Sequence, residues 1–311
     1  MLTEDLLIAV AFAFAVSIGA HYTGACMGMP YAAGAIRVGP ALAAMAALSL
    51  AGAILFSEGV ESTVGHSILP TPQVTLGLAL AIVLAALVLT TTYNYLRIPT
   101  STIQILVFSA VGAGLGVGLV VNWATIETLV ALWAVAPFAA LALGFLFVRI
   151  APRLRPRAGV PTALGRPVAY VLVAVGGAAS FAMGANDVAN ASGALVMTGL
   201  FGLVAAAALG GLGLAVGALT WGRPLLRRVA FDLVRLDPAM AATAQFAQAT
   251  VILVAVAFGL FTSLNQALVG AMIGVGIARG RSTVQWKTIR GILLGWAVGP
   301  ASGFLLALSV A

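Results

Sequence analysis

Long apolar segments, separated by short polar stretches, run the whole length of this 311-residue sequence. A run of about 20 apolar residues is long enough to cross a bilayer as a helix. Only 7% of the residues are charged, against about 25% in ordinary soluble domains. The sequence therefore predicts an all-α polytopic membrane protein, and it excludes a soluble globular domain, a disordered chain and a nucleic-acid-binding protein. The apolar segments are 6–36, 41–57, 74–96, 100–121, 126–149, 167–200, 202–222, 239–260, 262–278 and 288–310.

The basic residues predict an orientation in the membrane. Lys and Arg concentrate in cytoplasmic loops of membrane proteins. If the N-terminus lies outside and each segment crosses once, every basic stretch falls inside, whereas Glu58 and Glu61 fall in an outer loop. We therefore expect a multi-pass protein of the plasma (inner) membrane with both termini extracytoplasmic; a segment that forms a re-entrant hairpin would modify this path. The inside stretches are Arg37, Arg97, 149–166, 223–235 and 279–290.

The two halves of the chain resemble each other. Gly19-Ala20 matches Gly184-Ala185, Thr100-Ser101 matches Thr262-Ser263, and the pentad WAVAP at 133–137 matches WAVGP at 296–300. This duplication predicts a first membrane repeat at 1–150, a basic cytoplasmic linker at 151–166 and a second repeat at 167–311. About five spans per repeat, an odd number, would give the repeats opposite topology, with broken helices or hairpins at mid-membrane and a site where they meet.

The run GANDVANASG at 184–193 is the main candidate for chemistry. Intramembrane charge is costly and is usually functional, and Asp187 is the only acid expected deep inside a span. Asn186 and Asn190 are four residues apart and share one helix face. Glycines around the run would allow a broken helix. The alternative is a buried polar cluster that only holds helices together.

GANDVANA resembles the signature of the inorganic phosphate transporter (PiT) family. A second family element, a Pro-x-Ser-Thr-Thr-His-like run, is similar to PTSTIQ at 99–104 and more faintly to FTSLNQ at 261–266. The resemblance spans both halves. It implies two inverted repeats, a centrally bound oxyanion and a cotransported cation, together with membrane lipid as surroundings, a homodimer as a plausible assembly, no nucleic acid and no enzymatic activity.

The first half departs from the family pattern. It reads GAHYTGACMG, so that His21 and Tyr22 replace Asn and Asp, and Gly24-Ala25 replaces Ala-Asn. Gln104 and Gln266 replace the motif histidines. The first half from Ile18 to Ile36 looks more like the sulfate-permease branch of the family. Loss of one carboxylate removes a hard oxygen ligand for Na⁺, which favours proton coupling or a reduced sodium stoichiometry.

The resemblance assigns substrate contacts to uncharged groups, because no Lys or Arg is expected within a span core. Helix N-termini and hydroxyl or amide side chains can supply the donors. Asp187 and His21 are the coupling-ion candidates, with Na⁺ also possible at Asp187, Asn186, Gln104 and Gln266; no cofactor is expected. The substrate-binding candidates are Asn186, Asn190, Thr23, Gly24, Ala25, Thr100, Ser101, Thr102, Ser263 and Asn265.

The leading interpretation is a symporter that imports a tetrahedral oxyanion. Neutral donors suit sulfate, whereas a fixed carboxylate acceptor could recognise the proton of phosphate, so a phosphate transporter coupled to sodium or protons is the alternative. A passive anion channel is a less favoured one. His21 could instead be a structural residue hydrogen-bonded to the backbone. Residues Tyr93–Tyr95 are expected to be interfacial anchors.

Overall fold

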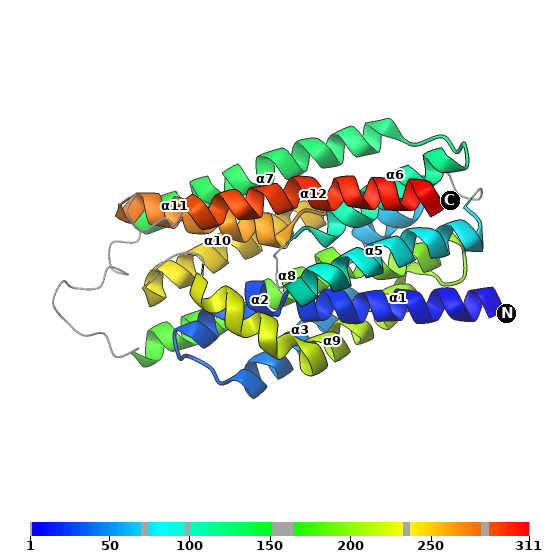
Figure 1. Cartoon of the computed structure of the whole chain (residues 1–311). Helices are drawn as coiled ribbons and strands as arrows, with labels where there is room; N and C mark the ends of the chain where they lie inside the picture. Colours follow the sequence, from blue (N-terminus) through cyan, green and yellow to red (C-terminus); the bar gives the residue numbers. More distant parts are fainter. Residues whose placement is uncertain are drawn as a thin grey trace.

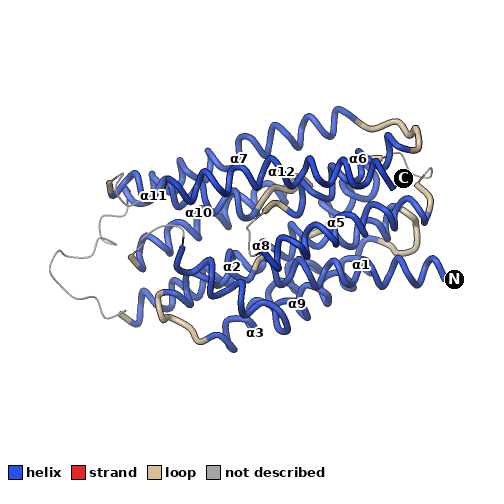
Figure 2. The backbone as a smooth tube through the Cα atoms, in the orientation of Figure 1, coloured by secondary structure: helices blue, strands red, loops and turns tan. Residues whose placement is uncertain are grey.

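The chain forms an elongated bundle of helices (Figure 1). The structure is a computed structural model that describes residues 2–69, 74–96, 100–150, 165–232, 237–280 and 286–310. Within these ranges every regular element is a helix and no strand occurs (Figure 2). Eight helical stretches have the length and apolar composition of membrane spans. The predicted all-α, multi-span class is confirmed.

In the described residues, the first half supplies seven α-helices and one π-helix up to residue 150. The first apolar segment is broken at Tyr22, and a short helix with a π-helical turn follows the second segment. These elements are α1 (Leu2–His21), α2 (Thr23–Ala32), α3 (Val38–Phe56), α4 (Glu58–Ser62), the π-helix η1 (Thr63–Ser67), α5 (Leu76–Leu96), α6 (Thr102–Gly116) and α7 (Trp123–Ile150).

In the described part of the second half there are five helices, which follow the same order of long and short elements except that α4 and η1 have no counterpart. The counterpart of α1 and α2 is a single long helix, and the counterpart of α6 is again a short one. The elements are α8 (Arg166–Met197), α9 (Leu203–Asp232), α10 (Pro238–Ala257), α11 (Leu264–Arg279) and α12 (Trp286–Val310). The 151–164 part of the predicted linker, and Arg97, lie outside the described residues.

Two pairs of helices fold back as hairpins instead of crossing. Arg279 at the end of α11 lies 3.7 Å from Asp237 at the start of α10, and Gly114 near the end of α6 packs against Leu69, which precedes α5. With 15 and 16 residues, α6 and α11 extend only about 23 Å, less than the roughly 30 Å hydrocarbon core. The expectation that every segment crosses once is therefore wrong for these pairs. A hairpin and two successive crossings both return the chain to the side from which it started, so the sides expected for the other segments do not change.

The hairpins enter the bundle from opposite ends. In Figure 1 the α5–α6 hairpin starts at the end where both termini lie, and the α10–α11 hairpin starts at the other end. Each of the main contacts between the halves also occurs twice. Helices α1 and α3 of the first half correspond to α8 and α9 of the second, and α1 packs on α9 just as α8 packs on α3. In the same way α6 packs on α12, and its counterpart α11 packs on α7. This arrangement supports the expectation of two oppositely directed halves.

Helix α8 runs unbroken through the GANDVANASG segment, contrary to the break that its glycines allowed. Gly184 instead lets α3 and α8 touch, because a Cβ at this position would overlap the carbonyl oxygen of Ser49. Small residues that permit such close approach are typical of membrane helix pairs. The break occurs in the first half, at Tyr22.

Residues 58–69 do not form the expected outer loop. They continue as α4 and η1, which pack against α8, and Glu61 is fully buried. Glu58, by contrast, is exposed as expected, and so is His66 on η1. The next apolar run begins only with α5, so this stretch is an additional buried element of the bundle.

Candidate functional site

The tips of the two hairpins meet at the centre of the bundle. Gln104 and Gln266 exchange amide hydrogen bonds, of 3.3 Å from Gln104 Nε2 and 3.1 Å from Gln266 Nε2. Ser101 and Ser263 cap the N-termini of α6 and α11, and each hydroxyl accepts from the backbone amide three residues later, at 3.4 Å. Serine is a preferred N-cap because its oxygen satisfies a free amide of the first turn. Two helix N-termini are thus brought together at one place.

The middle of α8 faces these tips. Asn186 Nδ2 donates to the carbonyl of Thr262 at 2.8 Å and to Asp187 Oδ2 at 2.9 Å, and Asn186 Oδ1 accepts from the Thr262 amide at 3.0 Å. Both ends of the Asn186 amide are therefore committed. It fixes the second hairpin tip beside the carboxyl group of Asp187.

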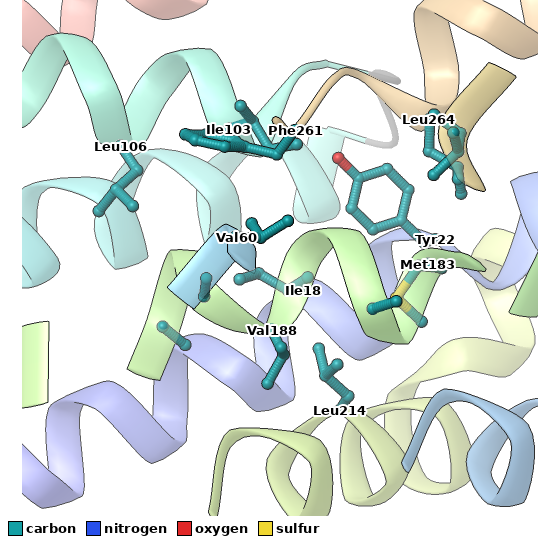
Figure 3. Close-up of a cluster of buried hydrophobic side chains, with 14 of the residues drawn as sticks. Ile18, Tyr22, Val60, Ile103, Leu106, Met183, Val188, Leu214, Phe261 and Leu264 are labelled. Atoms are coloured by element: carbon teal, nitrogen blue, oxygen red, sulfur yellow. The ribbon is translucent and has the colours of Figure 1, made fainter. Parts of the chain in front are cut away.

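Thr102 joins the two halves through its hydroxyl. Thr102 Oγ1 lies 2.9 Å from the hydroxyl of Tyr22, 3.5 Å from Asp187 Oδ1 and 3.4 Å from Asn190 Nδ2. Asn190 Nδ2 also donates to Asp187 Oδ1 at 3.3 Å. All four side chains are buried, and Figure 3 shows Tyr22 among apolar side chains from both hairpins, including Ile103 and Leu264. We call these four residues the Thr102 cluster.

His21 occupies the position equivalent to Asn186 and makes the equivalent contact. Its Nε2 lies 3.2 Å from the carbonyl oxygen of Thr100, and its Nδ1 lies 2.5 Å from Asn94 Oδ1. Asn265 Nδ2 approaches the same Nε2 at 3.2 Å and donates to the Thr100 carbonyl at 2.8 Å. With a donor and an acceptor beside Nε2, the ring can be accommodated in its neutral or its charged form.

The site contains no positive side chain. Among the described residues, the buried polar groups include two acids, Asp187 and Glu61, but no Lys or Arg. Several buried oxygens near the tips have no hydrogen-bond partner within the protein, which is uncommon. The tip oxygens without a partner are Thr100 Oγ1, Thr262 Oγ1 and Asn190 Oδ1. A polar ligand that has both hydrogen-bond donors and acceptors would satisfy these three oxygens. A ligand that binds together with a cation or with water would also do so.

The predicted residues fall into two groups. The structure brings together His21, both hairpin tips and the α8 asparagines. Thr23 is placed differently, because its hydroxyl donates to the backbone carbonyls of Ala20 and Gly222. Gly24 and Ala25 are buried in α2, where the Ala25 carbonyl accepts from Gln245 Nε2 at 3.2 Å.

Three site residues were not predicted from the sequence. Tyr22 was read as the loss of an acid, although its hydroxyl takes part in the Thr102 cluster. Asn94 was expected at an interface with its tyrosine neighbours, but it is buried and orients His21. Gln248 donates to the carbonyl of Leu264 at 3.2 Å. A polar amide within an apolar segment was the only signal for Asn94 and Gln248.

The possible cation ligands are divided between two places. Asp187 and Asn186 are adjacent, whereas the amides of Gln104 and Gln266 are bonded to each other. No group of three or more His, Cys, Asp or Glu suited to a metal ion occurs in the described part of the chain. The arrangement offers one carboxylate with amide and hydroxyl neighbours, which can bind a proton or a monovalent cation.

Comparisons with known proteins point to one family. The sequence model of the phosphate transporter family matches residues 18–168 and again 156–307. The chain is 27% identical to a protein named putative phosphate permease from Pyrococcus horikoshii, covering 96% of this chain and 95% of that one. It is 28% identical to the sulfate permease CysP of Bacillus subtilis, covering 94% and 84%.

A solved structure shares the fold. The structure titled the sodium-dependent phosphate transporter matches 100% of this chain and 98% of its own, with a TM-score of 0.89 and 22% sequence identity. This likeness shows that the two chains share the overall fold. Together with a family match that covers both halves, it establishes that this chain belongs to the phosphate transporter family, which is a family of transporters and not of enzymes.

Proposed function

We propose that the chain is a secondary active symporter that imports an inorganic tetrahedral oxyanion, most favourably sulfate, coupled to protons. Its two halves would form an inverted repeat that alternately exposes the Thr102 cluster to each side of the plasma membrane, with both termini outside. The observation that carries this proposal is the convergence of both hairpin tips on Asp187, the single acid of a site that, among the described residues, contains no buried Lys or Arg.

The site suits an anion held by neutral donors. Two capped helix N-termini, from α6 and α11, place the positive ends of their dipoles at the hairpin tips. The hydroxyls of Tyr22 and Thr102 and the amide of Asn190 can turn from one another to the oxygens of a ligand. Sulfate, with four acceptor oxygens and no proton, matches such a set of donors.

Asp187 provides the coupling. An ionised carboxylate in this buried site would repel a dianion, and the described surroundings hold no buried Lys or Arg to offset that repulsion. A proton or Na⁺ bound at Asp187 removes the negative charge. The anion and the cation therefore favour each other's binding, which is the thermodynamic requirement for symport.

Phosphate is the second candidate substrate. Relatives named phosphate permeases and a solved sodium-dependent phosphate transporter support it. A protonated phosphate could donate its hydrogen to Asp187, an interaction that sulfate cannot make. Tyr22 favours sulfate, because it places a neutral hydroxyl where the second half has Asp187, and both side chains reach Thr102.

The test is uptake of radiolabelled sulfate by the full chain in liposomes, with phosphate, thiosulfate and molybdate as competitors and with pH and sodium varied independently. We expect concentrative sulfate uptake that an inward proton gradient drives. Preferential uptake of phosphate would contradict the substrate proposal. Uptake that only runs downhill, and continues in Asp187→Asn, would indicate a channel.

A further inference from the structure

The segment α4–η1 buries an acid that the proposed transport site does not use. The side chain of Glu61 has no exposed surface, although α4 lies outside the eight candidate spans. Its Oε1 lies 2.5 Å from the hydroxyl of Ser192 on α8. Its Oε2 is buried without a hydrogen-bond partner. A buried carboxyl with one free oxygen is costly to keep ionised.

The hydrogen bonds around Ser192 require one more hydrogen than the serine can supply. The Ser192 hydroxyl is 2.8 Å from the carbonyl oxygen of Val188 as well as 2.5 Å from Glu61 Oε1. One hydroxyl hydrogen can serve only one of these acceptors. If Glu61 is protonated, its O–H donates to Ser192 Oγ and Ser192 donates to Val188, so both contacts are satisfied.

In the described helices that pack against α4–η1, no charged group offsets an ionised Glu61. On α8 the nearest titratable residue is Asp187, which is itself an acid; on α4 and η1, Glu58 and His66 are exposed. Helices α3 and α10 contain no ionisable residue, and the basic residues of α9 begin only at Arg223. Burial accordingly raises the pKa of Glu61 to about 8, and the Ser192 contact opposes this only in part.

The position of Glu61 connects it with the proposed site. Ser192 lies five residues after Asp187 on α8, roughly 7.5 Å along the helix. The same α4–η1 segment touches the second hairpin tip, where Thr63 donates to the carbonyl of Gly259 at 2.7 Å and Gly59 packs against Gly259. A movement of this tip would therefore alter the burial of Glu61. π-Helical turns such as η1 are frequent at functional sites.

We propose that Glu61, with Ser192 as its hydrogen-bond partner, is a second proton-binding site of this transporter, protonated while α4–η1 is packed on α8 and ionised when that contact opens. The ligand is a proton and not a metal cation, because the one hydrogen-bond partner described for the carboxyl is the Ser192 hydroxyl, and the described residues hold no group of three or more His, Cys, Asp or Glu suited to a metal ion. The role of Glu61 in coupling rests on the proposed symport. The protonation of Glu61 in the folded protein does not depend on that proposal.

The first test measures thermal unfolding between pH 5 and pH 9 in detergent. A folded-state pKa above the unfolded value means that the stabilisation is complete below the unfolded pKa, near 4.5, and is lost as pH rises through about 8. We expect the Tm of the unmodified chain to fall by several degrees over this range, and that of Glu61→Gln to fall clearly less. Glu58→Gln, which changes an exposed acid on the same helix, should follow the unmodified chain. Equal pH profiles for all three would overturn the proposal.

The second test measures transport in liposomes. We expect Glu61→Gln to retain sulfate–sulfate exchange and to lose most of the acceleration that an inward proton gradient gives, with Glu58→Gln unaffected. Undiminished acceleration in Glu61→Gln would refute the coupling role. If the unmodified chain moves no oxyanion, the proposed function fails, and protonation of Glu61 is then decided by the unfolding profiles.

If Glu61→Gln does not fold, infrared spectroscopy replaces it. In Asp187→Asn, Glu61 is the one buried acid left among the described residues. We expect the carbonyl band of a protonated carboxylic acid at pH 6, and its loss by pH 9. Absence of this band at pH 6 would overturn the proposal.

Discussion

Thr102 is the residue on which both halves of the molecule converge. Its hydroxyl contacts Tyr22 from the first half, and Asp187 and Asn190 from the second. The Thr102 hydroxyl can donate to Asp187 while it accepts from Tyr22 and Asn190, so its own hydrogen bonds are complete, whereas Asn190 Oδ1 is buried without a partner. This open acceptor is consistent with the proposal that the cluster binds a polar ligand.

Replacement of Asp187 by Asn tests the coupling role. The amide keeps the size and the contact to Asn190 but cannot bind a proton, so we expect loss of concentrative uptake with little change in Tm. The measurement is gradient-driven sulfate uptake in proteoliposomes, with Glu127→Gln, an exposed acid on α7, as the matched control. Full gradient-driven uptake by Asp187→Asn would remove this residue from the mechanism.

Tyr22→Phe tests the contribution of the hydroxyl in the first half. Removal of one hydrogen bond costs about 0.5–1.5 kcal/mol, so the sulfate concentration for half-maximal uptake should rise about 2- to 13-fold while the fold is kept. The measurement is the concentration dependence of initial uptake rates. An unchanged value would show that the Tyr22 hydroxyl does not contact the anion. Tyr31→Phe serves as the control, because Tyr31 lies at the end of α2 and is only half-buried.

At the scale of single residues, the sequence predicted those site residues that are polar or charged within an apolar membrane span. Asp187, Asn186 and Asn190 are polar in an apolar span, and the structure places them together. Asn94 was expected to be an interfacial anchor and Glu61 to lie in an outer loop, because Asn94 lies near the end of an apolar run and Glu61 lies between two such runs. Their burial depends on the packing of distant helices, which one sequence does not specify.

At the scale of elements, the close contact of α3 with α8 holds the central helix in place. Gly184 makes this contact possible, since a Cβ there would meet the Ser49 backbone, which cannot move alone. Such contacts maximise van der Waals packing, the main attraction between helices in lipid. The glycines near GANDVANA thus allow close packing and not a helix break.

Gly184→Ala should destabilise the bundle through this contact. Overpacking typically costs about 1–3 kcal/mol, so we expect a lower Tm in detergent and reduced folded yield. Gly202→Ala is the matched control, because an added Cβ there meets nothing within 4 Å. Equal Tm values for the two variants would show that α3 and α8 can separate without cost.

The pair Gln104–Gln266 should behave as one unit. Each single change to Leu leaves the other amide buried without its partner, whereas the double change replaces both by apolar groups. We expect the double variant to be less destabilised than the sum of the two singles, by about 0.5–3 kcal/mol. The free energy of unfolding in denaturant is measured for the unmodified chain, the two single variants and the double variant. If the two single destabilisations simply add in the double variant, the pairing of the two glutamines is contradicted.

The hairpins themselves were not predictable from apolar length. With 21 and 20 residues, α5 and α10 are as long as true spans, so hydropathy alone assigns them as crossings. The structural signals are the short partners α6 and α11 and the contact of Arg279 with Asp237 across the base of one hairpin. Such pairing depends on tertiary packing.

At the scale of the whole molecule, repetition within the sequence predicted the architecture. The matched motifs of the two halves correspond to hairpin tips that meet and to helix pairs that recur with exchanged partners. A structure built in this way can open to either side by similar movements of its two halves. The proposed alternating access follows from that equivalence.

Proton coupling is tested on the intact transporter by separate gradients. An inward proton gradient without sodium should raise initial sulfate uptake several-fold, whereas an inward sodium gradient at equal pH should change it little. The physical reason is the single carboxylate of the Thr102 cluster, which provides few hard oxygen ligands for sodium. A strict requirement for sodium would overturn proton coupling.

The lack of any buried Lys or Arg in the described core has an electrical consequence. Import of one sulfate dianion together with one proton on Asp187 and one on Glu61 transfers no net charge in a full cycle, because the two ionised carboxylates of the empty site carry the same charge as the bound sulfate of the loaded site. Moving a net charge through the membrane potential costs about 2.3 kcal/mol per 100 mV, and a cycle that moves no net charge is not driven by that potential. Loading with sulfate under clamped voltage should therefore produce no steady current.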